Sequence, residues 1–308
     1  MKIQRASHLG MCFGVRDAIN LAISEARRQS LTVLGDLVHN ATVLDRLHRE
    51  GIVTARETGD IATPTVMVTA HGASDRAKAA LRAQGLHVLE ATCPLVRHAH
   101  LAVLSLARQG FHPVIVGQRN HVEVRGLTGD LDAFDVVLTE ADVDALTARP
   151  RFGVAAQTTQ PTEHVRQLVN RLRERFPTAE VKFVDTVCRP TKDRQWAAVE
   201  LAQQSDVVIV VGGAHSNNTR QLVMTCSRYC HRVHHVEQAA DLRPEWFLPG
   251  DAVGLTAGTS TPDDIIRAVE SGLEAVAAGM ERAGAPLVAE PAPGTAPRLE
   301  APLALHHA

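Results

Sequence analysis

Short apolar runs alternate with longer stretches of helical periodicity along most of this chain. Three runs rich in β-branched residues each end at a glycine, as is typical of strands buried on both faces of a parallel sheet. These runs are residues 32–34, 114–116 and 207–211. A stretch with apolar residues three and four positions apart precedes each run, and this spacing predicts amphipathic helices. The predicted helices cover residues 15–28, 96–108 and 193–203.

A cysteine stands before each predicted helix, at nearly the same distance from the glycine that ends the next strand. The distance is 23 residues from Cys12 to Gly35, and 24 residues in each of the later units, which contain Cys93 and Cys188. An extended stretch leads into every cysteine, and a second apolar run follows later in every unit. Because repeated strand and helix units connect through right-handed crossovers, we expect an α/β fold of three pseudo-threefold related parallel-sheet lobes.

The lobe boundaries are predicted to follow the cysteines. We expect residues 1–93 to form the first lobe, 94–187 the second and 188–283 the third. The third unit lacks a closing strand before a cysteine, so a strand within residues 1–11 is expected to close onto it. Residues 284–308 contain 5 prolines and 7 alanines. Such a stretch buries too little apolar surface to offset its ordering entropy, and it is predicted to be a disordered tail.

Polar residues follow the predicted strands at matching positions. His39, His121 and Ser216 each stand four residues after the glycine that ends the first strand of a unit. The turns after the second strands contain His71, Thr158 and Ser260. In open parallel sheets, ligands bind beyond the carboxyl ends of the strands. These residues and the three cysteines are therefore expected to converge on one central site.

Composition narrows the classes of partner. The 308 residues carry 32 basic and 34 acidic side chains and only ten aromatic ones, which predicts no nucleic-acid partner. No apolar run approaches the roughly 18 residues of a membrane span, so no membrane is expected. Five cysteines are an odd number at low density, and the first residues contain no apolar signal core. We therefore expect a cytoplasmic protein.

The three matched cysteines are candidate metal ligands. The start of a helix lowers the pKa of a thiol, so Cys12, Cys93 and Cys188 are predicted to be available as thiolates. Three thiolates would leave one iron of a 4Fe-4S cluster open to substrate. A zinc ion with one open position would use the same ligands, and spacing alone does not separate the two metals. Cys226 and Cys230 are more simply explained by packing inside the protein than by a second metal site.

The motifs around these residues point to one family. They surround Cys12, His39, His71, Cys93, His121 with Glu123, Thr158, Cys188, Ser216 to Asn218, and Ser260. In this order, they resemble the LytB-type 4-hydroxy-3-methylbut-2-enyl diphosphate reductases over about residues 1–280. The resemblance implies a three-lobed fold around one 4Fe-4S cluster per chain, ligated by Cys12, Cys93 and Cys188. It also implies reductive removal of the substrate hydroxyl as water, which yields isopentenyl and dimethylallyl diphosphates.

The same resemblance implies roles for the remaining residues. Diphosphate binding would fall to His39, His71, Ser216, Asn218 and Ser260, with the Asn217 amide as a further donor. His121 and Thr158 would orient the reacting end of the substrate, and Glu123 would deliver protons. The chain has no nucleotide, flavin or nicotinamide motif, so electrons must come from outside. The expected donor is a ferredoxin or a flavodoxin.

Some positions depart from the family pattern, and other functions use similar sites. Asn217 replaces a frequent serine, Val122 a usual proline, and residues 118–120 a Gly/His-rich turn, which leaves open a shifted substrate. A quinolinate-synthase-like dehydratase or condensing enzyme would also join three lobes with one cysteine each. A cluster-bearing redox sensor or a zinc-organised binding module is the non-enzymatic alternative. The His-x-Glu motif and the Ser-Asn-Asn turn favour the reductase.

Overall fold

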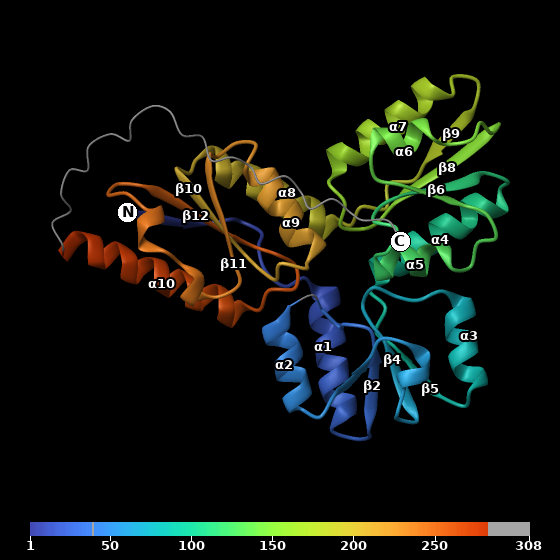
Figure 1. The fold of residues 1–308 in the computed structure, drawn as a ribbon, viewed down its shortest axis with the longest axis horizontal. Helices are drawn as coiled ribbons and strands as arrows, with labels where there is room; N and C mark the ends of the chain where they lie inside the picture. Colours follow the sequence, from blue (N-terminus) through green and yellow to red (C-terminus); the bar gives the residue numbers. More distant parts are fainter. Residues whose placement is uncertain (39, 283–308) are drawn as a thin grey trace.

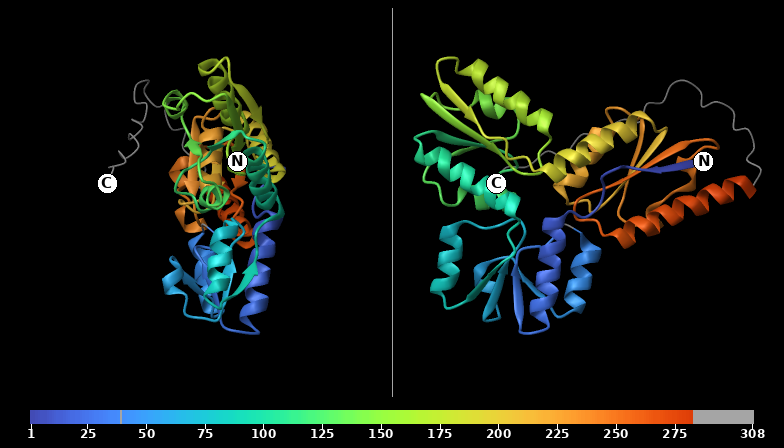
Figure 2. Two further views of the ribbon diagram at one scale, coloured as in Figure 1. Left: turned by 90° about the vertical axis from the view of Figure 1, so that its right-hand side faces the viewer. Right: turned by 180° about the vertical axis from the view of Figure 1, so that it is seen from behind.

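The computed structural model describes residues 1–38 and 40–282, and these form three α/β lobes around a common centre (Figure 1). His39 and residues 283–308, which include the predicted tail, lie outside the described residues. Each lobe contains a four-stranded sheet in which all pairings are parallel. The side view in Figure 2 shows the lobes side by side in one flat layer. The predicted fold class of three parallel α/β lobes is confirmed.

The three sheets have equivalent strand orders. The first sheet has the order β3-β2-β4-β5, the second β7-β6-β8-β9, and the third β11-β10-β12-β1. The strands of the first sheet are β2 (Leu31–Leu34), β3 (Val53–Ala55), β4 (Thr65–Val68) and β5 (His87–Glu90). Those of the second are β6 (His112–Val116), β7 (Asp135–Val137), β8 (Arg151–Ala156) and β9 (Glu180–Phe183). Those of the third are β1 (Lys2–Arg5), β10 (Val207–Val211), β11 (Arg232–Val236) and β12 (Ala252–Ala257).

The N-terminal strand belongs to the third sheet. Strand β1 pairs in parallel with β12, with Ile3 opposite Val253, and occupies the place that β5 and β9 have in their own sheets. In Figure 1, this blue strand runs through the orange lobe toward the centre of the molecule. The chain therefore closes into a ring of lobes.

Helices cover the sheets, and three of them start at the central cysteines. They are α1 (Phe13–Ala26), α4 (Pro94–Arg108) and α8 (Arg189–Gln203), and each has a cysteine as its N-cap residue. The other α-helices are α2 (Ala41–Arg49), α3 (Asp75–Ala83), α5 (Val122–Thr128), α6 (Glu140–Asp144), α7 (Thr162–Arg175), α9 (Asn217–Cys226) and α10 (Asp263–Arg282). Short 3-10 helices occupy Thr58–Asp60, Ala239–Asp241 and Pro244–Trp246. In the described part of the chain, no helix has the length and apolar character needed to cross a membrane.

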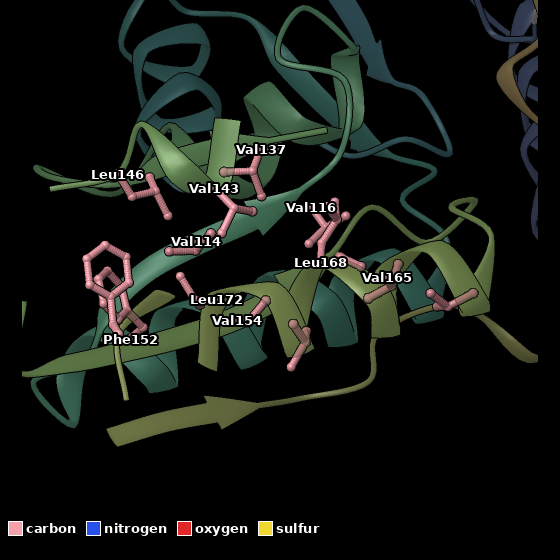
Figure 3. Close-up of a cluster of buried hydrophobic side chains, with 14 residues drawn as sticks. Val114, Val116, Val137, Val143, Leu146, Phe152, Val154, Val165, Leu168 and Leu172 are labelled. Carbon is pink, nitrogen blue, oxygen red and sulfur yellow. The ribbon is translucent and has the colours of Figure 1, made fainter. Parts of the chain in front are cut away.

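Each lobe has its own apolar core. In the second lobe, Val114 and Val154 from the sheet pack against Leu168 and Leu172 of α7, with Phe152 at one end (Figure 3). Burying one such side chain stabilises the fold by about 1.5–3 kcal/mol. Small branched side chains fill the space between this sheet and its helices. The first lobe contains one such cluster, and the second and third lobes contain clusters on both faces of their sheets.

Candidate active site

The three cysteines have the same backbone setting in each lobe. The amide of Cys12 donates to the carbonyl of Thr259 at 3.2 Å, that of Cys93 to Ala70 at 3.1 Å, and that of Cys188 to Thr158 at 3.0 Å. Each acceptor lies two residues beyond the end of the central strand β12, β4 or β8. Every cysteine is thereby tied to a turn that carries a predicted site residue.

All three cysteines line one cavity of about 510 Å³. Apolar side chains, including Val15, Leu95 and Val96, form part of its wall. The packing is tight at one point, because a Cβ atom added to Gly14 would lie 2.6 Å from the Sγ atom of Cys93. Among the described residues, no group of three or more His, Cys, Asp or Glu side chains has the arrangement of a metal-ion site.

The pKa values of two thiols differ from the prediction. Burial raises the pKa of the Cys93 thiol, and it raises that of Cys188 to about 11. Hydrogen bonds at the starts of α4 and α8 lower both values, but by less than burial raises them. The prediction of lowered thiol pKa values is therefore wrong for Cys93 and Cys188. A bound metal would have to displace the thiol protons, as metal binding to cysteine generally does.

A buried carboxyl group lies beside the cysteines. Glu123, near the start of α5, is 1% exposed, and it accepts hydrogen bonds from the Thr158 amide at 2.6 Å and the Thr158 hydroxyl at 3.0 Å. Burial raises the pKa of Glu123 to about 7, although both bonds from Thr158 lower it. The Nδ1 atom of His121 accepts from the Glu123 amide at 3.1 Å and caps the same helix. This carboxyl group is suited to exchange a proton near neutral pH.

A second cavity, of about 360 Å³, adjoins the first. Its wall contains polar side chains from all three lobes, and it shares several residues with the cysteine-lined cavity. The predicted site residues in its wall are His71, His121, Glu123, Ser216, Asn217, Asn218 and Ser260. The rings of His71 and His121 meet edge to face, with centroids 5.5 Å apart. Glu123 and His71 line both cavities and therefore lie where the two meet.

Two buried polar atoms in the second cavity have unused hydrogen-bonding capacity. Within the described residues, neither the Nδ2 atom of Asn218 nor the Oγ atom of Ser260 has a hydrogen-bond partner. Ser216 caps α9, and Asn217 and Asn218 form the first turn of that helix. A helix N-terminus and unpaired donors both favour a negative charge, so the chemistry of this cavity, called the anion cavity below, is compatible with an anionic ligand.

Comparison with known proteins assigns the family. The family model described as LytB protein matches residues 3–274. A protein of Aquifex aeolicus (strain VF5), named 4-hydroxy-3-methylbut-2-enyl diphosphate reductase, is 37% identical over 281 residues, which are 89% of this chain and 96% of that protein. This chain belongs to the LytB family. A protein of the same name from Dehalococcoides mccartyi (strain CBDB1) is 37% identical over 284 residues, 91% of this chain and 100% of the relative.

Solved structures of LytB-type reductases share the fold. The structure of (E)-4-hydroxy-3-methyl-but-2-enyl diphosphate reductase, described as the terminal enzyme of the non-mevalonate pathway, is 36% identical. It covers 89% of this chain and 99% of its own, with a TM-score of 0.66. The Plasmodium falciparum reductase structure is 26% identical and covers 86% of each chain, with a TM-score of 0.79.

This LytB chain places the predicted site residues around two adjoining cavities, except His39, which lies outside the described residues. Two residues missed in the sequence, Thr159 and Thr259, line both cavities. They stand beside Thr158 and Ser260 in the same two turns, so their positions in the repeat were the available signal. Thr191, also missed, approaches the sulfur of Cys188 at 3.1 Å from the first turn of α8.

Two departures from the LytB pattern contact one another. Gln118 Nε2 donates to Asn217 Oδ1 at 3.1 Å, and Asn217 Nδ2 donates to Thr159 Oγ1 at 3.3 Å. Asn217 thus links α9 of the third lobe to two turns of the second lobe. The substitutions form one interlobe contact at the edge of the anion cavity, and the side chains of Ser216, Asn218 and Ser260 remain in its wall.

A buried arginine completes the surroundings of the cysteines. Arg194 is 7% exposed, and its Nε and Nη2 atoms donate to the Gly10 carbonyl at 3.0 and 2.7 Å. Its Nη1 atom donates to the Pro190 carbonyl at 2.8 Å. Gly10 precedes Cys12 by two residues and Pro190 follows Cys188 by two, so this side chain joins the backbones around two cysteines.

The remaining two cysteines pack elsewhere. Cys226 and Cys230 are 0% and 4% exposed, and both belong to an apolar cluster between α8, α9 and the third sheet. Burial raises the pKa of the Cys226 thiol to about 12. Both side chains act as small apolar groups in the core.

Proposed function

We propose that this chain is a 4-hydroxy-3-methylbut-2-enyl diphosphate reductase that removes the substrate hydroxyl as water and releases isopentenyl and dimethylallyl diphosphates. One observation carries the proposal: a cysteine-lined cavity and an anion-binding cavity meet at Glu123. A substrate with a diphosphate at one end and a reducible hydroxyl at the other needs this combination. The names of the LytB relatives favour the reductase over the quinolinate-synthase-like and non-enzymatic alternatives.

The residues present fit a 4Fe-4S cluster. Cys12, Cys93 and Cys188 would hold it, since their sulfurs line one cavity with apolar walls and three thiolates leave one iron free. When bound, the cluster would supply the electrons and a Lewis-acidic iron for the substrate hydroxyl. The apolar wall would keep water from this end of the substrate.

The diphosphate would lie in the second cavity. Asn218 Nδ2 and Ser260 Oγ would donate to its oxygens, with further donors from Ser216, Asn217 and His71. His39 is proposed as another diphosphate ligand from the family resemblance alone. The N-terminus of α9 would add a favourable interaction with the negative charge.

Glu123 would deliver the protons, with Thr158 and His121 orienting the carboxyl group and the reacting end. The reaction consumes two electrons and two protons: one proton leaves with the hydroxyl as water, and the other forms a C–H bond on the allylic fragment. With a pKa raised to about 7 by burial, Glu123 can both hold and release a proton near neutral pH. A bound diphosphate would raise the pKa of Glu123 further, since a nearby negative charge disfavours a second one.

Electrons would come from a ferredoxin or a flavodoxin, because nothing in the sequence matches a flavin or nicotinamide site. Thiols that must stay reduced to hold a cluster also favour a cytoplasmic location.

The test is anaerobic turnover. The cluster-loaded protein is reduced with dithionite and methyl viologen in the presence of the allylic diphosphate, and the products are identified by mass spectrometry. Formation of the two five-carbon diphosphates, dependent on iron loading, is the expected result. A fully loaded protein that leaves the substrate unchanged would refute the assignment.

A further inference from the structure

A wide groove opens on the surface between the second and third lobes, away from the substrate cavity. It encloses about 1070 Å³ and lies between the start of α7, the outer face of α8 and the segment after α9. In Figure 1, α8 and α9 lie on the side of the third lobe that faces the second. The residues of its wall that matter here are Arg166, Lys192, Gln195, Trp196, Arg228 and Tyr229.

The groove combines exposed aromatic surface with positive charge. Trp196 is 79% exposed and Tyr229 is 49% exposed, in a chain that has only ten aromatic residues. Three cations, Arg166, Lys192 and Arg228, line the groove. Arg166 pairs with Glu163 at 3.9 Å and Lys192 with Asp185 at 2.8 Å, whereas Arg228 has no carboxylate partner among the described residues. Large exposed aromatic side chains beside arginine are characteristic of residues that dominate the affinity of protein interfaces.

Hydrogen bonds join the two sides of the groove, and one side is formed by the helix that begins at Cys188. The side chain of Gln195 accepts from the Thr162 amide at 3.2 Å and donates to the Gln160 carbonyl at 3.1 Å, which ties α8 to the start of α7. Trp196 follows Cys188 by eight residues on α8, a distance of roughly 12 Å along a helix axis. Lys192 stands one turn from Cys188, roughly 6 Å along the axis.

We propose that this groove, centred on Trp196, is the docking surface for the protein that delivers electrons, an acidic one-electron carrier. This proposal rests on the proposed function. The unpaired positive charge of Arg228 attracts an acidic partner, whose carboxylates could also compete for Arg166 and Lys192. The exposed rings of Trp196 and Tyr229 give that partner an apolar anchor. A carrier seated there would place its redox centre over α8, the helix that begins at Cys188, without blocking the substrate cavity.

The test compares a protein electron donor with a small-molecule electron donor. Trp196→Ala and the double variant Arg166→Glu, Arg228→Glu are assayed with reduced ferredoxin and, separately, with dithionite and methyl viologen. Leu101→Ala, at a 55% exposed leucine on α4, and Arg173→Glu, on α7 outside the groove, are matched controls. Ferredoxin-driven kcat/KM is expected to fall about tenfold or more in the groove variants only, while viologen-driven turnover is unchanged.

Binding gives a readout that does not depend on turnover. Calorimetric titration of oxidised ferredoxin or flavodoxin into the loaded enzyme should show weaker binding for both groove variants and for the wild type at high salt. Equal binding by wild type and groove variants would overturn the proposal. So would a parallel loss of activity with both donors, or a dimer in sedimentation that Trp196→Ala abolishes. A wild type inactive with viologen would refute the proposed function instead, and the titration would still decide the docking surface.

Arg194 carries a second inference on a separate observation. Among the described residues, no carboxylate lies within 4.0 Å of its guanidinium group, and the nearby Asp193 pairs with Arg189. Its hydrogen bonds end on the neutral carbonyls of Gly10 and Pro190. Burial lowers the pKa of Arg194, whereas Cys12, Cys188 and Asp193 raise it. A buried cation without an anionic partner is costly, so this position favours a negative group beside it.

We infer that Arg194 is a positioning residue whose charge balances the negative cluster held by Cys12 and Cys188 and raises its reduction potential. A fixed positive charge stabilises the reduced, more negative state over the oxidised one. This inference also depends on cluster binding, but its readout is a potential rather than turnover.

The variants are Arg194→Gln, Arg194→Lys and the control Arg232→Gln, which removes an arginine paired with its own carboxylate, Asp251. Iron and sulfide content is measured first, and then the midpoint potential by titration monitored with electron paramagnetic resonance. Arg194→Gln should shift the potential to a more negative value, while Arg194→Lys and the control stay near the wild type. An unchanged potential in loaded Arg194→Gln would overturn the inference. If Arg194→Lys loads a cluster and Arg194→Gln does not, a positive charge at this position is required for cluster binding. If neither variant loads a cluster, the hydrogen bonds of Arg194 to the Gly10 carbonyl are what cluster binding requires, and the inference fails.

Discussion

The substitution Glu123→Gln tests the central carboxyl group through its charge alone. The amide is nearly the same size, its oxygen can accept the 2.6 Å hydrogen bond from the Thr158 amide, and its nitrogen can donate to the Thr158 hydroxyl. The substitution removes the ionisable carboxyl group, which binds its proton more tightly in the folded chain than in the unfolded chain. The pKa of Glu123 is about 7 in the fold, against a reference value of 4.5.

The magnitude follows from this difference. Because the pKa is raised in the folded state, the protonated group contributes its full stability below pH 4.5 and loses it as the pH rises through 7. A tenfold change in proton affinity corresponds to about 1.4 kcal/mol, so the complete loss is roughly 3 kcal/mol. The glutamine variant has no such dependence. Relative to the wild type, it should therefore gain roughly 2–3 kcal/mol in free energy of unfolding between pH 5 and pH 8.5.

The assay is equilibrium urea unfolding of the metal-free wild type and variant across that pH range, with Glu200→Gln as an exposed control. In parallel, viologen-driven turnover of the loaded proteins is measured. The wild-type rate should fall as the pH rises above 7, and the variant should lose about 10²–10⁴-fold at neutral pH. A stability difference that does not change with pH would refute the raised pKa. Unchanged turnover would remove Glu123 from proton delivery.

Three further substitutions follow from the site. Gly14→Ala should reduce iron loading, since the new Cβ would lie 2.6 Å from the Cys93 sulfur. The control Gly279→Ala should load iron normally, because no atom lies within 4 Å of the added Cβ. Iron analysis of the two purified proteins measures the difference. Ser260→Ala should raise KM about tenfold or more with kcat less affected, because a hydrogen bond to a charged group contributes about 1.5–3 kcal/mol. Asn217→Ser should lower the free energy of unfolding by about 1 kcal/mol, because it breaks two interlobe hydrogen bonds. It should leave the products unchanged by mass spectrometry, and a new substrate preference would show that Asn217 selects the substrate.

The repeat made much of this fold predictable from the sequence. Equal spacing from cysteine to glycine located the three helices and their neighbouring strands, and the strand at 207–211 was predicted with its observed ends. The strands β3, β7 and β11 were missed. Two of these are only three residues long, and β11 carries two histidines, so none presents a long apolar run.

The candidate site was predictable as a set of residue types but not in its electrostatics. Spacing pointed to His121 and Thr158, and the family resemblance added Glu123. The pKa values of the thiols depend on burial in the folded chain, which reversed the expected direction for Cys188. Arg194 escaped notice because its partner, Gly10, lies 184 positions away in the chain. Contacts of this length leave no periodic signal in the sequence.

The pairing of β1 with β12 sets an order for the maturation of this protein in the cell. Cys12, a proposed iron ligand, is made early in translation, but its amide is anchored to Thr259, which lies 247 positions later in the chain. The three cysteines would therefore share one complete site only after strand β12 has been made and paired with β1. If these cysteines hold a cluster, delivery of iron and sulfide would follow that step, and chains truncated before β12 should accumulate without metal.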